Sequence, residues 1–154
     1  MIAVTLLVAV ATLVVLVITL AVFSAAEGSV RLLTRARTRR LLEAERPGAT
    51  ALDALMDRPS RLAAAGSVWR AIAFVVSALV SSWAATRLLA SEAQWWEAAA
   101  GAAVGAVVLY VLGETLPRTL AVHNPESVGL AAAPMAVRLT AVFAPVARFF
   151  ALGW

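Results

Sequence analysis

The sequence predicts an all-α membrane protein with three transmembrane helices, a pair of short cytoplasmic helices and a kinked juxtamembrane helix. Its mean hydropathy is +0.89. Only 14% of its residues are charged, whereas soluble domains carry about 25%. Most of the charges fall between long apolar runs. A water-soluble globule is therefore excluded, and because the chain contains no cysteine, so are a disulfide framework and a thiolate metal site.

The basic character of the chain points to a membrane rather than to nucleic acid. The pI is about 11.3, and all 13 basic residues are arginine. The arginines border the apolar runs, which is how membrane proteins place positive charge. The expected partner is therefore the lipid bilayer, and nucleic acid is not expected.

The first transmembrane helix is predicted over residues 2–26, because residues 1–26 contain no charged side chain. At about 1.5 Å per residue, a helix of this length crosses a hydrocarbon core of roughly 30 Å. A cleaved signal peptide is the alternative, since Ser24, Ala25 and Ala26 are small residues near a candidate cleavage point. We favour a retained helix because there is no basic segment before the apolar run, which also exceeds the usual 7–15 residues.

Two further helices are predicted over residues 62–86 and 95–116. Arg70 interrupts the first of them, and the second is free of charge from residue 98 to residue 113. Trp83 lies late in the first, and Trp95 and Trp96 open the second. Because amphipathic rings favour the headgroup level, these three tryptophans indicate one membrane interface.

The distribution of arginine predicts the orientation. Only Arg87 lies in the short loop between the second and third helices, together with Glu92 and Glu97. Eight arginines lie between the first and second helices: Arg31, Arg35, Arg37, Arg39, Arg40, Arg46, Arg58 and Arg61. The positive-inside rule places that segment in the cytoplasm. We expect a multi-pass protein of the plasma membrane with its N-terminus outside and its C-terminus in the cytoplasm.

The arginine-rich segment itself is predicted to form a pair of short helices over residues 30–58. Thr50 followed by Asp53 is a variant of the capping box, so the second helix is expected to have Thr50 as its N-cap. Pro59 is expected to end that helix just before the second apolar run.

A kinked helix along the cytoplasmic membrane surface is predicted over residues 125–152. Asn124 and Pro125 suit the N-cap and the first helical position. The segment is long enough to be a fourth transmembrane helix, but it contains Pro134, Pro145 and two arginines. We therefore favour a helix lying in the interface. No repeat or linker divides the chain, so residues 1–154 are read as a single membrane domain.

Three ionisable residues lie within or at the edges of the apolar helices: Glu27, Arg70 and Glu114. A charge near the centre of a membrane helix costs about 2.5–3.5 kcal/mol on insertion scales, so such residues face a partner or a water-filled cavity. They are the first candidates for a functional site. For Glu27 the alternative is a carboxylate that reaches water from the end of its helix.

Oxygen atoms around Glu114 have the chemistry of a hard-cation site. Pro117 has no N–H, so the carbonyl of Gly113 is expected to lose its helical donor beside the Glu114 carboxylate. Ser24 and Glu27 are three residues apart and share one helix face. Together these groups suit Mg²⁺ or Ca²⁺. The alternative is a proline-kinked helix whose glutamate pairs with a basic residue.

Other motifs are weaker. Gly101 and Gly105 form a G-x-x-x-G that allows close helix packing, within the subunit or across a dimer. His123 is the only histidine and is expected to lie at the surface. No metalloprotease, nucleophile-elbow or phosphate-loop motif occurs in the sequence, so no enzymatic activity is expected.

The sequence resembles the transmembrane domain of the CorC/CNNM family of magnesium transporters over its whole length. The specific block is residues 113–121, Gly-Glu-Thr-Leu-Pro-Arg-Thr-Leu-Ala, followed by Asn-Pro-Glu at 124–126. Supporting matches are Phe-Ser-Ala-Ala-Glu at 23–27 and Asp-Arg-Pro at 57–59.

The resemblance implies a homodimer with three transmembrane helices that exports Mg²⁺ in exchange for Na⁺. It also implies that Ser24 and Glu114 bind Mg²⁺. Family members usually continue into CBS domains, and residues 1–154 contain none.

One position departs from the family pattern. Trp69 and Arg70 stand where the family has a Gly-Asn pair whose asparagine binds Mg²⁺. A guanidinium cannot coordinate a metal and stays charged. One hypothesis is that Arg70 occupies the place of the cation and pairs with Glu27 or Glu114, leaving a transport-inactive structural or regulatory subunit that dimerises with itself or a paralogue. An Arg70–Glu114 ion pair would favour it.

The first expectation is nevertheless a divalent-cation (Mg²⁺) transport or efflux domain of the CorC/CNNM type, whose metal site is degenerate where Arg70 replaces the family asparagine. The transport-inactive subunit is the alternative, and it does not apply if the alignment is shifted by a turn or if Arg70 reaches the cytoplasmic surface. A generic three-helix anchor for a soluble domain is the third reading.

Overall fold

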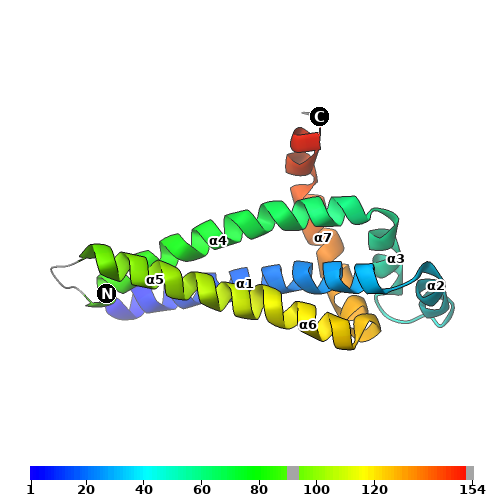
Figure 1. Cartoon of the computed structure of the whole chain (residues 1–154), viewed down its shortest axis with the longest axis horizontal. Coiled ribbons are helices and arrows are strands. Elements are labelled where there is room, and N and C mark those ends of the chain that lie inside the picture. Colours follow the sequence, from blue (N-terminus) through cyan, green and yellow to red (C-terminus); the bar gives the residue numbers. More distant parts are fainter. Residues whose placement is uncertain (90–93, 152–154) are drawn as a thin grey trace.

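The computed structural model describes residues 1–89 and 94–151, and all of its regular elements in these ranges are helices (Figure 1). The elements are α1 (Ile2–Leu32), α2 (Arg35–Glu43), α3 (Ala49–Asp57), α4 (Pro59–Leu89), α5 (Gln94–Val108), the π-helix η1 (Leu109–Thr115), α6 (Leu116–His123) and α7 (Pro125–Ala151). The all-α class is therefore confirmed.

Three long helical rods run side by side, and α7 crosses them steeply (Figure 1). The rods are α1, α4 and the continuous run of α5, η1 and α6. They include the segments predicted at 2–26, 62–86 and 95–116 and extend beyond each of them. The extra turns are more polar, because they carry residues such as Arg31, Arg87 and Arg118 at the ends of the rods.

Within residues 1–89 and 94–151, four helices and not three are long and apolar enough to cross a membrane: Ile2–Leu32, Pro59–Leu89, Trp95–His123 and Pro125–Val146. The expected number of three is therefore not confirmed. Pro134 and Pro145 lie inside α7 without ending it. The predicted limit of this helix at residue 152 lies outside the described residues.

Small residues hold α4 against α5. A Cβ atom on Gly101 would lie 2.6 Å from the Ala85 Cβ, and one on Gly105 would lie 2.7 Å from the Ser81 Cβ. In lipid there is no hydrophobic driving force between helices, so membrane helices associate through close packing contacts of this kind. The G-x-x-x-G motif thus packs within the subunit.

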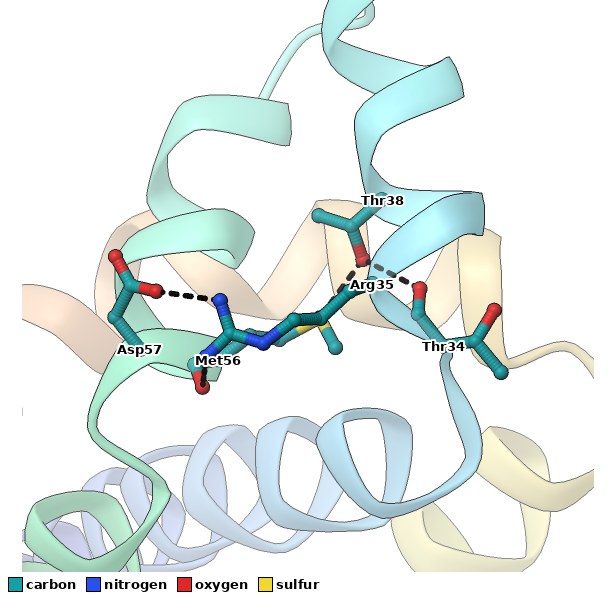
Figure 2. A network of polar contacts seen from close by, with 5 residues as sticks. All are labelled: Thr34, Arg35, Thr38, Met56 and Asp57. Carbon is teal, nitrogen blue, oxygen red and sulfur yellow. Dashed lines mark hydrogen bonds and ion pairs between the residues drawn. The ribbon is translucent and has the colours of Figure 1, made fainter.

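The short helices α2 and α3 form the predicted pair and are fastened to each other (Figure 2). The Arg35 Nη1 atom donates to the Asp57 Oδ1 atom over 2.9 Å. The Thr38 hydroxyl lies 3.2 Å from the Thr34 carbonyl oxygen and 2.7 Å from the Met56 sulfur. These contacts join the first turn of α2 to the last turn of α3.

The predicted N-cap of α3 is wrong. The helix begins at Ala49 and its N-cap is Gly48, not Thr50. Gly48 has a φ of 84° and lies against the Leu130 carbonyl, where a Cβ atom would overlap the backbone. Only glycine adopts this conformation without strain in so little space, so the contact with α7 sets the helix start.

The outer surface of the bundle is apolar. Large apolar side chains are exposed along the first half of α1: Ile2, Val4, Leu7, Val10, Val15 and Ile18. Trp83, near the end of α4, and Trp95 and Trp96, at the start of α5, are also exposed, with Trp95 at 79%. Exposed apolar side chains in such numbers, on helices long enough to cross a bilayer, mark contact with a membrane, and the structure is that of a multi-pass membrane protein.

Replacing Gly105 with leucine is expected to destabilise the bundle by about 1–3 kcal/mol, the usual cost of forcing added atoms into a packed site. The added side chain must displace Ser81 and push α5 away from α4. Ala103→Leu is the matched control, because Ala103 is exposed on the same helix. Denaturation in detergent checks this: equal losses of stability for the two variants would contradict the packing described.

Candidate functional site

Three helices bring Glu27, Arg70 and Glu114 together. The Arg70 Nη2 atom lies 3.5 Å from the Glu27 Oε2 atom, and the Arg70 Nε atom lies 3.3 Å from the Glu114 Oε1 atom. The carboxylates come from α1 and η1, and the guanidinium comes from α4. One arginine thus joins the three rods of the bundle through two ion pairs.

A second guanidinium group also pairs with Glu114. Arg118 lies one turn after Glu114 and places its Nη2 atom 3.2 Å from the same Oε1 oxygen. Two carboxylates therefore pair with two guanidinium groups, and Arg31 lines a cavity together with Glu27 and Arg118. The Glu27 side chain is 6% exposed and that of Arg70 is 23% exposed, so these charges are largely removed from solvent. Charges so buried need partners of opposite sign.

Arg118 was not among the site residues predicted from the sequence. Its spacing of four residues from Glu114 is the signal that identifies it, because side chains at this spacing are neighbours on a helix. It lies at the exposed edge of the site, with 46% of its side chain accessible.

Gly66 makes room for Glu27 and was also not predicted. A Cβ atom at Gly66 would overlap the Glu27 Oε1 atom and lie 3.5 Å from the Phe23 ring. Gly66 is one turn before Arg70, so both lie on the α4 face that meets α1. The Glu27 Oε1 atom has no hydrogen-bond partner among the described residues. The missing side chain at Gly66 is what lets the carboxylate lie between the two helices.

Ser24 and Gly113 lie near these charges without joining them. Ser24 is fully buried, and its hydroxyl makes no hydrogen bond to a described residue. Gly113 lies against Leu20 of α1, where a Cβ atom would be 3.1 Å from the leucine Cδ2 atom. The small residue allows η1 to approach α1 one turn from Ser24. Their role as cation ligands stays a prediction.

Pro117 lies where the π-helix passes into α6. The Leu116 N–H donates to the Val111 carbonyl, five residues back. If this spacing continued, Pro117 would leave the carbonyl of Leu112 without a donor, whereas in an α-helix it would leave that of Gly113. A widened turn of this kind beside Glu114 is typical of functional positions in helices.

Trp69 occupies the space beside Arg70 on α4. Its Nε1 atom donates to the Thr19 hydroxyl over 3.1 Å, and its ring packs on Phe143 of α7 with centroids 5.2 Å apart. Trp69 and Arg70 therefore have partners on three other elements. These contacts fix the rotation of α4 that directs Arg70 to the carboxylates.

The described residues contain no cluster of three His, Cys, Asp or Glu side chains that could hold a metal ion. A divalent cation at this site would depend on the two carboxylates plus neutral oxygens such as the Ser24 hydroxyl. His123 lies apart from the site: its Nδ1 atom is 2.8 Å from the Thr119 carbonyl oxygen, and the residue is exposed.

Gly66→Ala tests whether the glycine accommodates Glu27. Alanine is about 1 kcal/mol more favourable than glycine inside a helix. In the wild-type background the new methyl group displaces the Glu27 carboxylate, and the cost of that displacement offsets this gain. In a Glu27→Ala background nothing is displaced, so the same change is expected to stabilise the protein. We expect a coupling free energy of about 1 kcal/mol or more, measured by denaturation of the four proteins in detergent. Additivity within about 0.5 kcal/mol would overturn this description.

Comparison with known families identifies the domain. The model of the cyclin M transmembrane N-terminal domain, CNNM, matches residues 10–153. A search of curated proteins found no match. The family match covers nearly the whole chain, including the α1, α4 and η1 segments that carry the site. This chain belongs to the CNNM family, whose transmembrane domain is associated with divalent-cation transport.

Proposed function

We propose that this chain is a CNNM-type membrane subunit in which Arg70 takes the place of a divalent cation, so that it has a structural or regulatory role and does not carry Mg²⁺ through this site. The observation that supports the proposal is the position of the guanidinium, 3.5 Å from Glu27 and 3.3 Å from Glu114. In this role the subunit forms a dimer with a second copy or with a paralogue.

The electrostatics of the site favour this reading over simultaneous binding of Arg70 and Mg²⁺. With Arg70 and Arg118 in place, the two carboxylates are already neutralised. Adding Mg²⁺ would leave two uncompensated positive charges in a largely buried site, at a large cost in free energy. Mg²⁺ also gives up its water reluctantly. For a cation to bind, Arg70 must first leave the carboxylates.

Transport of Mg²⁺ through the same site, in exchange for Na⁺, is the second candidate. The observation in its favour is a pair of buried oxygens, the Ser24 hydroxyl and the Glu27 Oε1 atom, that have no hydrogen-bond partner among the described residues. With Glu114 and a carbonyl near Pro117, such as that of Gly113, they offer the oxygen ligands that Mg²⁺ prefers. In this candidate Arg70 is a counter-ion that moves aside during transport.

For either function we propose that α1, α4 and the α5–η1–α6 rod cross the plasma membrane. The N-terminus is then outside and the arginine-rich pair α2 and α3 is in the cytoplasm. The steep crossing of α7 over the three rods supports its placement along the cytoplasmic surface rather than across the bilayer (Figure 1). The site then opens toward the cytoplasmic side, because Glu27 lies near the end of α1 that leads into α2 and lines a cavity together with Arg31 and Arg118.

Arg70→Asn is expected to create Mg²⁺ binding that the wild type lacks. Because the chain contains no cysteine, a single Thr115→Cys change beside Glu114 reports on the site alone. In detergent, Mg²⁺ at millimolar concentration should slow labelling of this thiol in the Arg70→Asn protein, and should raise its melting temperature as binding to the folded state requires. Neither change is expected in the wild type.

Arg87→Asn is the matched control, because it removes the same charge from the exposed far end of α4. Arg70→Lys keeps a positive charge between the carboxylates, so it should show no Mg²⁺ effect. Adding Glu114→Gln to Arg70→Asn should abolish the Mg²⁺ effect. Saturable protection of the wild type, as strong as that of Arg70→Asn, would refute the proposal and establish the second candidate.

A further inference from the structure

A second group of arginines lies around a cavity apart from the Glu27–Arg70–Glu114 site. The cavity has a volume of about 590 Å³ and lies between the α3–α4 corner and α7. Arg58, Arg61 and Arg148 line it together with apolar side chains that include Leu62 and Ala141. Cavities that hold small ligands have volumes of roughly 300–1,000 Å³.

These three arginines lack partners within the described part of the chain. Each of Arg35, Arg37, Arg70 and Arg118 makes an ion pair with a carboxylate. None of Arg58, Arg61 and Arg148 pairs with a described carboxylate, and all three are exposed. The cavity therefore combines apolar walls with positive charge that the described residues do not neutralise.

One polar atom inside the cavity is also without a partner. Thr140 of α7 lines the cavity, and its hydroxyl is buried with no hydrogen bond to a described residue. A buried hydroxyl without a partner costs free energy, and it can donate to an ester or phosphate oxygen.

We propose that this cavity binds an anionic phospholipid. The phosphate group is held by Arg58, Arg61 and Arg148, because guanidinium groups bind phosphate through charge-assisted hydrogen bonds. The upper part of an acyl chain lies along Leu62 and Ala141, and Thr140 donates to the lipid. The site is separate from the ion pairs of Arg70, so its occupancy does not depend on whether the domain transports a cation.

The position of the cavity favours a lipid over a soluble anion or a second copy of the chain. Arg58 and Arg61 lie just before and within the first turn of α4, where this long apolar helix begins. Basic residues next to a transmembrane helix meet the anionic lipids of the cytoplasmic leaflet. A soluble anion gains nothing from the apolar walls, whereas a phospholipid matches both the walls and the charge.

The test measures lipid binding to the full chain in a neutral detergent, by native mass spectrometry and melting temperature. Phosphatidylglycerol is the anionic probe, phosphatidylcholine the neutral one, and inorganic phosphate the soluble one. We expect saturable binding of phosphatidylglycerol and at least roughly tenfold weaker binding of the other two probes. The double variant Arg58→Gln/Arg61→Gln should weaken phosphatidylglycerol binding by roughly tenfold or more, since each basic residue near an anionic lipid surface contributes about a fivefold factor.

Two matched controls separate the cavity from general surface charge. Arg39→Gln/Arg40→Gln removes the same charge from the exposed helix α2 and should leave binding unchanged. Ala141→Phe should fill the cavity and weaken binding without changing any charge, whereas Ala131→Phe places the same ring on an exposed position of α7 outside it.

Equal losses in the two double-arginine variants would overturn the proposal in favour of diffuse attraction. If phosphatidylcholine binds as tightly as phosphatidylglycerol, the cavity does not discriminate between charged and neutral lipids. If inorganic phosphate binds as tightly, the cavity is a site for soluble anions. Dimers that disappear on Ala141→Phe while no lipid binds would assign the cavity to a second copy of the chain. Each of these results contradicts an anionic-lipid site.

Discussion

The charge of Arg70 is the constraint on which the arrangement of the bundle depends. A guanidinium remains charged inside a protein, so it must find carboxylates among the residues that surround it. The two carboxylates within reach belong to α1 and η1, and the pairing therefore fixes how α4 is rotated and how far it is shifted against both. Gly66 and Trp69 support this placement, one by leaving space for Glu27 and the other by bonding to Thr19.

Much of the site followed from the sequence because charge is costly inside apolar helices. Glu27, Arg70 and Glu114 could be paired in advance, since few other ionisable groups lie within these runs. What the sequence did not reveal depends on contacts between distant segments. Gly48 precedes α3 because only glycine fits against the Leu130 carbonyl there. Gly66 leaves the space on α4 that the Glu27 carboxylate occupies. Neither contact leaves a local pattern.

Helix α7 shows a different limit of sequence reasoning. Its two prolines and two arginines favour a kinked helix along the membrane surface, and the segment is helical through both prolines. Proline removes one N–H and crowds the carbonyl one turn back, but it does not end a helix that packs on its neighbours. Here α7 packs on α1, α3 and α4. Length and composition alone therefore cannot separate a surface helix from a fourth transmembrane helix.

Arg70 and the arginines around the cavity satisfy their charge in different ways, and the difference follows from their burial. Arg70 lies along α4, well inside the bundle, so its partners must come from the chain itself. Arg58, Arg61 and Arg148 lie at the start of α4 and late in α7, where the chain places no described carboxylate against them. In the proposed orientation, water and lipid headgroups are within reach at that level, so the chain need not provide the negative charge. Substitutions at Arg70 therefore change the packing of the helices, whereas substitutions around the cavity change the proposed binding of lipid.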